Sequence, residues 1–158
     1  VPFHGGFVFM NIYGIPKPSY RAYELLRRLG NELLKVTGKH TTVDIWIVRK
    51  NDTINIMITN WALPRHPIKT ELVKVQLDKI KKVKASSVER IDESHANARK
   101  VWADIGSPES LTPHQVSKLE LSSALRVEPL PVDQKKGSVL VEVTVPPQGV
   151  AYMTLELE

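Results

Sequence analysis

Residues 41–61 read TTVDIWIVRKNDTINIMITNW, and this stretch decides the fold. Apolar residues stand at every second position on both sides of a central Asn-Asp pair. They are Val43, Ile45 and Ile47 before the pair, and Ile54, Ile56 and Ile58 after it. A period of two places these side chains on one face of each strand, and Asn-Asp favours a turn. The stretch therefore predicts an antiparallel hairpin with one buried face.

Four further stretches have the features of strands. They are residues 68–77, VKASSVERI (83–91), SVLVEVTV (138–145) and VAYMTLEL (150–157). In the third of them valine alternates with other residues, and a Pro-Pro-Gln-Gly turn separates it from the fourth. About six antiparallel strands joined by short turns predict a mainly β fold, an antiparallel β-sandwich.

Helices are predicted at the N-terminus and between the fourth and fifth strands. KPSYRAYELLRRLG (17–30) has Pro18 in its first turn and Gly30 at the position that ends a helix. Its helical spacing predicts one buried stripe, formed by Ala22, Leu25, Leu26, Leu29 and Leu33. Two short inserted helices are predicted at residues 96–105 and 113–122, the second with a capping box from Thr112 and Gln115.

Composition excludes several classes of protein. The chain has 158 residues and no cysteine, so it carries neither disulfides nor thiolate zinc sites. No apolar run approaches the roughly 20 residues that span a bilayer, and we expect no membrane partner. The net charge is +5, but the lysines from Lys74 to Lys84 alternate with apolar residues, as on the wet face of a strand. No aromatic residue interleaves them, so we expect no nucleic-acid partner.

The histidines predict no metal site. His4, His40, His66, His95 and His114 form no pair at metal-binding spacing, and no motif for a cofactor is present. We therefore expect no metal and no cofactor.

The densest polar cluster lies at residues 92–97 and has two interpretations. Asp92, Glu93, His95 and Asn97 form a strand-to-helix corner whose side chains cap backbone donors, which is the favoured hypothesis. Alternatively, the first three are the catalytic residues of an independent small enzyme.

The three tryptophans also leave two interpretations open. Trp46, Trp61 and Trp102 stand at strand or helix positions, where an indole most often belongs to the core. An exposed indole would instead favour a sugar platform, so a carbohydrate-binding β-sandwich module is the alternative function.

Two separated motifs carry a resemblance to a known family. FHGGFVFMNIYGIPKPSYRAYELLRRLGNELL (3–34) resembles the end of the catalytic barrel in glycoside hydrolase family 39, the family of β-xylosidases and α-L-iduronidase. RIDESHANARKVWADIGSPESLTPHQVSKLELSSAL (90–125) resembles the segment inserted in the C-terminal β-sandwich of that family. The FHGGF and GIPKP elements look nearer to the xylosidase branch, although Val8 stands where bacterial members usually have glycine.

The resemblance implies a C-terminal part of a longer enzyme. Residues 1–36 would be the last loop and helix of a (β/α)8 barrel, and residues 37–158 an accessory β-sandwich with a helical insertion at about 94–123. The family uses a retaining mechanism with an acid/base glutamate and a nucleophilic glutamate. Both belong to earlier barrel strands, so the resemblance implies no catalytic residue in this chain, which alone is predicted to be inactive.

The resemblance also implies a site and partners. His4, Gly5, Gly6 and Phe7 follow the eighth barrel strand and would lie at the edge of the sugar pocket. The partners would be the catalytic barrel and, through it, a xylo-oligosaccharide. The apolar face of the N-terminal helix would also allow a homo-oligomer.

Overall fold

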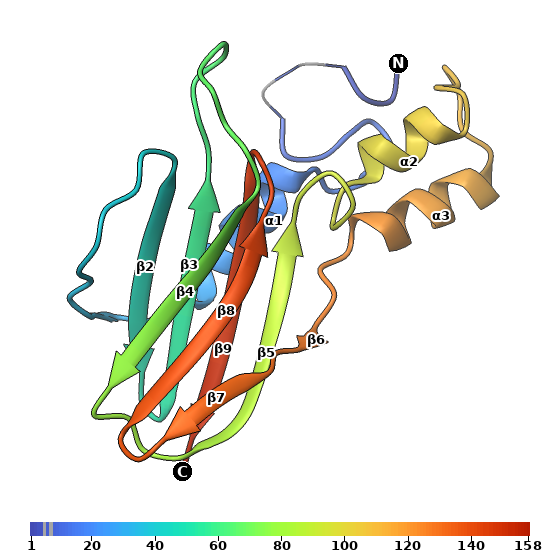
Figure 1. Ribbon diagram of the computed structural model, residues 1–158. Helices are drawn as coiled ribbons and strands as arrows, with labels where there is room; N and C mark the ends of the chain where they lie inside the picture. The colour runs from blue at the N-terminus through green and yellow to red at the C-terminus, as the bar shows by residue number, and fades with distance from the viewer. Residues whose placement is uncertain (5, 7) are drawn as a thin grey trace. The chain divides into compact units, whose positions relative to one another are not determined.

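The computed structural model describes residues 1–4, 6 and 8–158, which form three helices and nine strands (Figure 1). In chain order the elements are α1 (Pro18–Arg28), β1 (Glu32–Leu33), β2 (Val43–Lys50), β3 (Thr53–Asn60), β4 (Glu71–Asp78), β5 (Val83–Ile91), α2 (Ala98–Asp104), α3 (Pro113–Ser123), β6 (Glu128–Pro129), β7 (Val132–Lys135), β8 (Ser138–Val145) and β9 (Gly149–Leu157). They belong to two compact units, Val1–Leu26 with Arg90–Arg126, and Arg27–Glu89 with Val127–Glu158. We call these the helical unit and the sandwich unit.

The sandwich unit confirms the predicted β-sandwich. Its larger sheet has the strand order β1-β2-β3-β9-β5-β6, and its smaller sheet has the order β4-β8-β7. In Figure 1 the smaller sheet crosses in front of the larger one. The predicted hairpin is present. Its strands, β2 and β3, pair antiparallel, with Lys50 opposite Thr53 and Val43 opposite Asn60.

One apolar core joins the two sheets, as the alternation predicts. Buried side chains from the larger sheet include Ile47, Ile54, Ile56, Ile58, Met153 and Leu155, and those from the smaller sheet include Val75, Leu77, Val139, Val141 and Val143. Val43 and Ile45 are partly buried against the same core. The predicted inner face is therefore confirmed.

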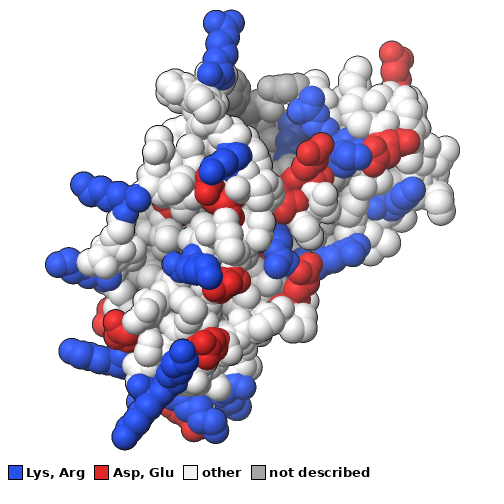
Figure 2. All heavy atoms as spheres, viewed as in Figure 1, with Lys and Arg blue, Asp and Glu red and all other residues white. Residues whose placement is uncertain are grey.

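The lysine-rich stretch contains the end of one predicted strand (68–77), a turn and the start of the next predicted strand (83–91). β4 ends at Asp78, Lys79 takes a φ of 57° in the turn, and β5 begins at Val83. Its lysines are exposed, and two of them form ion pairs, Lys74 with Glu142 at 2.6 Å and Lys82 with Glu158 at 2.7 Å. On the face seen in Figure 2, acidic side chains lie among more numerous basic ones.

Helix α1 is shorter than its apolar stripe predicts. It begins at Pro18 as expected and ends at Arg28, and Gly30 takes a φ of 121°. Leu25 is buried, but Leu26 is 46% exposed, and Leu33 lies in β1 and is 69% exposed. The inclusion of Leu33 in the stripe was therefore wrong, because the left-handed glycine ends the helix before Leu33 can share its face.

The end of α1 is fixed within the sandwich unit by polar contacts. Arg28 pairs with the buried carboxylate of Glu89 at 2.6 Å, and its guanidinium lies 5.1 Å from the centre of the Tyr152 ring. The Asn55 side chain of β3 donates to the carbonyls of Arg28 and Leu29, at 3.3 and 2.8 Å. These contacts satisfy carbonyls that the helix end leaves without partners.

The helical unit has a small core of its own. Phe3, Ile15, Ala98 and Leu119 are buried together, and the Tyr13 hydroxyl accepts a hydrogen bond from the Leu111 amide at 3.0 Å. The α3 helix begins with the predicted capping box, in which Thr112 and Gln115 bond each other's backbone amides. Throughout the described residues, no helix combines the length and apolar character needed to cross a bilayer.

Truncation of a central core residue tests the sandwich. Ile56 is fully buried on β3, so Ile56→Ala should lower the free energy of unfolding by about 2–5 kcal/mol, through lost burial and a residual cavity. Leu72→Ala is the control, because Leu72 lies on β4 but is exposed, and its effect should stay within about 0.5 kcal/mol. Equal losses in urea unfolding of the two variants would contradict the assigned inner face.

The buried hydroxyl of Tyr152 predicts a dependence of stability on pH. Burial raises the pKa of Tyr152 to about 12, and its hydroxyl has no hydrogen-bond partner among the described residues. A tyrosine in the unfolded chain has a pKa of about 10. The stability that this group contributes is therefore fully present below about pH 10. It is lost as the pH rises towards 12, because the unfolded chain then releases a proton that the folded chain retains.

Tyr152→Phe should remove this loss. At pH 7 the variant should be as stable as the wild type or slightly more stable, because the substitution deletes an unpaired buried hydroxyl. At pH 11 the wild type should have lost roughly 1–1.5 kcal/mol relative to the variant. Urea unfolding at both pH values measures the difference, and parallel pH profiles would contradict the assignment.

Candidate functional site

The N-terminal segment uses its histidine to hold a turn. The exposed His4 accepts a hydrogen bond at Nδ1 from the Gly6 amide, at 3.1 Å. The Lys17 ammonium donates to the carbonyls of Gly6 and His4, at 3.1 and 3.5 Å. Gly5 and Phe7, the other two residues predicted at a pocket edge, lie outside the described residues. The hydrogen bond from the Gly6 amide thus orients the imidazole of His4, and Nε2 lies on the opposite side of the ring.

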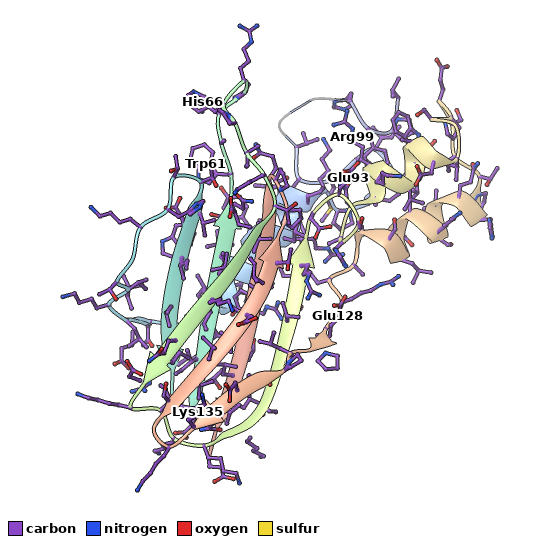
Figure 3. All side chains as sticks on the ribbon, in the orientation of Figure 1. Trp61, His66, Glu93, Arg99, Glu128 and Lys135 are labelled. Carbon is purple, nitrogen blue, oxygen red and sulfur yellow. The ribbon has the colours of Figure 1, made fainter. Side chains whose placement is uncertain are left out.

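The polar cluster at residues 92–97 forms the predicted corner. The nearly buried Asp92 carboxylate accepts hydrogen bonds from the amides of Ser94 and His95, at 2.7 and 2.9 Å, and lies 2.8 Å from the His95 Nδ1. The Asn97 side chain donates to the Asp92 carbonyl at 3.2 Å. Glu93 is exposed at the surface (Figure 3). Asp92 is therefore occupied by the backbone of the corner, as the favoured interpretation holds.

The tryptophans differ from the core interpretation. Trp61 is 50% exposed and Trp46 is 40% exposed, so the expectation that they are core residues was wrong for both. Trp102 is partly buried, donates its indole N–H to the Pro108 carbonyl at 3.0 Å and lies 5.5 Å from the Phe3 ring. Only Trp102 follows the expectation. Trp46 stands between Ile45 and Ile47, whose side chains pack at the core, so the period of two turns its own side chain to the opposite face of β2.

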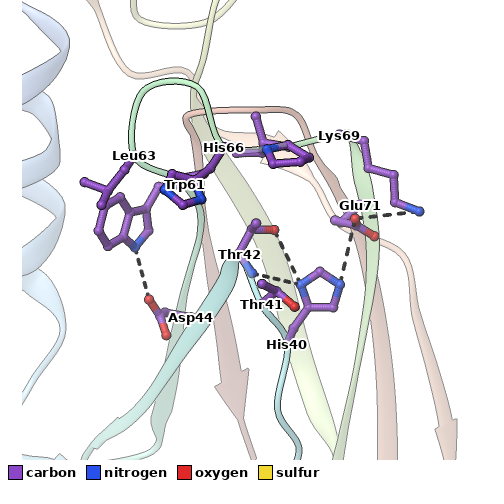
Figure 4. Close-up of a pocket in the computed structure, with 12 residues that line it drawn as sticks. His40, Thr41, Thr42, Asp44, Trp61, Leu63, His66, Lys69 and Glu71 are labelled. Carbon is purple, nitrogen blue, oxygen red and sulfur yellow. Dashed lines mark hydrogen bonds and ion pairs between the residues drawn. The ribbon is translucent and has the colours of Figure 1, made fainter.

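Trp61 borders a hollow of about 650 Å³ in the sandwich unit, between the start of β2 and the loop that joins β3 to β4 (Figure 4). We call it the Trp61 groove. Its polar and aromatic lining residues include Trp61, Asp44, His40, His66, Lys69 and Glu71, and Leu63, Pro67 and Ile68 add apolar surface. In Figure 3, Trp61 and His66 lie at one end of the sandwich and Lys135 at the other. Its volume lies within the roughly 300–1,000 Å³ of ligand sites.

Polar groups stand on two sides of this groove. The Trp61 indole N–H donates to Asp44 at 3.2 Å on one side. On the other side, His40 Nδ1 accepts from the Thr42 amide at 3.2 Å, and His40 Nε2 lies 3.8 Å from Glu71 (Figure 4). Because Nδ1 accepts, the proton of a neutral His40 is on Nε2, which faces the carboxylate.

The loop that carries Trp61 is tied down at both ends. Asn60 is fully buried and donates to the carbonyls of Lys69 and Val145, at 2.8 and 2.9 Å. The Gln148 side chain donates to the Ala62 carbonyl at 2.9 Å. The indole therefore projects from a rigid support.

Sequence reasoning considered Trp61 but missed its neighbours. The register of the β2–β3 hairpin places Trp61 opposite Thr42, whose carbonyl accepts its amide at 2.8 Å, and thus diagonal to Asp44. This neighbour could have been found by counting from the turn at Asn51. His40, His66 and Glu71 come from segments outside the hairpin, and no local pattern predicts that they meet.

The chain belongs to the glycosyl hydrolases family 39, whose family model matches residues 1–135. It is similar to a β-xylosidase from Caldicellulosiruptor saccharolyticus, with 37% identity over 159 residues that cover 99% of this chain and 33% of the relative. A β-xylosidase from Geobacillus stearothermophilus is 31% identical over 108 residues, or 67% of this chain and 20% of the relative. These matches bear out the resemblance carried by the two motifs.

Solved structures share the fold. A monomeric β-xylosidase from Caulobacter crescentus superposes with a TM-score of 0.77 at 25% identity and covers 99% of this chain and 34% of that one. The family 39 enzyme from Xanthomonas axonopodis pv. citri has a TM-score of 0.78 at 20% identity, over 100% of this chain and 34% of its own, and shows the fold alone. The chain thus spans about a third of the length of these proteins.

Proposed function

We propose that this chain is the C-terminal region of a longer retaining glycoside hydrolase that removes terminal xylose from xylo-oligosaccharides. The observation that carries the proposal is its 37% identity to a named β-xylosidase of which it covers 33%. In this proposal the chain completes and supports a catalytic barrel that holds both glutamates. Such carboxyl groups stand about 5–5.5 Å apart and form a glycosyl-enzyme intermediate between two steps.

Two nearly buried acids of the chain, Glu89 and Asp92, are engaged in holding the fold. Glu89 is buried but pairs with Arg28 at 2.6 Å, and Asp92 is held by two backbone amides and His95. A general acid or a nucleophile needs a carboxyl group that can reach the substrate. Glu89 and Asp92 are instead held by partners within the fold, so neither carboxylate is placed to reach a substrate.

The helical unit supports docking against a barrel. It exposes several large apolar side chains: Val8, Phe9, Met10, Ile12, Tyr23 and Leu26. The Phe9 and Tyr23 rings contact each other edge to face, with centroids 5.1 Å apart. Exposed apolar surface of this kind marks an interaction site. The proposed occupant is the remainder of the same enzyme, since relatives are about three times as long. A second copy of the chain is the alternative occupant.

The chain alone should hydrolyse no aryl β-xyloside, because removing either glutamate of a retaining pair typically costs orders of magnitude in rate. Activity assays and sedimentation on the purified 158 residues test this, with a full-length family enzyme as the positive control. A barrel fragment supplied separately should bind the chain, and Tyr23→Asp should weaken that binding. Turnover at the level of the control would overturn the proposed function.

His4 is proposed to stand at the edge of the sugar pocket of the whole enzyme. His4→Ala in that enzyme should lower kcat/KM for aryl xylosides by roughly tenfold or more, through a lost contact to the sugar. Lys17→Met is the matched control, because it removes hydrogen bonds to the same turn but leaves the imidazole in place. Equal kinetic effects of the two variants would show that His4 only holds the turn.

A further inference from the structure

We propose that the Trp61 groove binds a neutral oligosaccharide, with one pyranose ring stacked on the exposed face of the Trp61 indole. This site belongs to the sandwich unit and goes beyond the proposed function. Its ligand class follows from the chemistry of the groove. Only the choice of a xylo-oligosaccharide as the first probe rests on the proposed function.

The indole is a platform that is formed before a ligand arrives. Its N–H is fixed on Asp44 at 3.2 Å, its backbone amide is fixed on the Thr42 carbonyl at 2.8 Å, and half of the residue remains exposed. The face of an indole carries a partial negative charge. One face of a β-linked pyranose presents only C–H groups with partial positive charge, so ring and sugar are complementary. A fixed platform also binds with a smaller loss of side-chain entropy.

Hydroxyl-binding groups surround this platform. The bond from Trp61 occupies one acceptor position of the exposed Asp44, and a carboxylate has about four. On the opposite side, the contacts of Glu71 to His40 and Lys69 are long, at 3.8 and 4.0 Å. Both carboxylates can therefore accept from sugar hydroxyls. His66 on the loop adds an exposed imidazole that either donates or accepts.

The charge balance of the groove argues against ionic ligands. Two carboxylates, Asp44 and Glu71, stand with one ammonium, Lys69, and two histidines. Such a mixture offers no cationic cradle for a phosphate. Over the described part of the chain, no group of three His, Asp or Glu side chains is placed to hold a metal ion. A neutral polyol uses both the donors and the acceptors, and the aromatic face as well.

Calorimetric titration of the 158-residue chain with xylohexaose, up to about 10 mM, tests the site. We expect saturable binding that Trp61→Ala weakens by about tenfold or more, since stacking is lost. Trp46→Ala is the matched control, because Trp46 is 40% exposed but does not line the groove. The affinity of this variant for xylohexaose should equal that of the wild type. Asp44→Asn should weaken binding while keeping the fold, which circular dichroism checks.

Several results would overturn the site. These are the absence of binding to xylohexaose, cellohexaose and maltohexaose, equal binding by the wild type and Trp61→Ala, or equal losses in the Trp61 and Trp46 variants. Binding of cellohexaose alone that depends on Trp61 would support the groove but count against a xylosidase parent. Catalytic inactivity of the chain bears on the proposed function and leaves the groove unaffected.

Discussion

The burial of two apolar strand faces against each other is the constraint on which the sandwich unit depends. Neither sheet can shield its inner face by itself, and β3, β8 and β9 supply the most completely buried side chains. A shift of one residue in any of these strands would turn its buried side chains to solvent. The register of the β2–β3 hairpin is therefore fixed by the core, and with it the place at which each loop leaves the sheets.

The groove is a consequence of that register. Asn60 ends β3 inside the core, where its amide group holds the carbonyls of Lys69 and Val145. The next residue, Trp61, is the first beyond β3, and half of it is exposed. Two neighbouring residues thus differ in role: the buried Asn60 amide anchors the loop, and the Trp61 indole is exposed to solvent. The rigid end of the sandwich supports a loop that presents an aromatic side chain to solvent.

The helical unit and the sandwich unit present surfaces of different chemistry. The helical unit combines a small core of its own with exposed apolar residues such as Ile12 and Tyr23, which suit a protein partner. The sandwich unit offers a hollow with balanced charge, which suits a soluble polar ligand. In the proposed enzyme the first surface would meet the barrel, and the second would bind a sugar chain.

Local patterns in the sequence determined the strands of the hairpin, the faces they bury, the capping box at Thr112 and the helix end at Gly30. These features depend on neighbours within a few residues, so their periodicity or turn chemistry is sufficient. The two motifs likewise determined the family. Even the contact of Trp61 with Asp44 follows from the hairpin register.

Only the tertiary structure decided which residues meet across long separations. It grouped Val1–Leu26 with Arg90–Arg126 and brought His40 and Glu71 together. It also placed Arg28 on Glu89, 61 residues further along the chain. Such contacts leave no periodic trace in the sequence, because each depends on where separate segments are placed once the apolar faces have been buried.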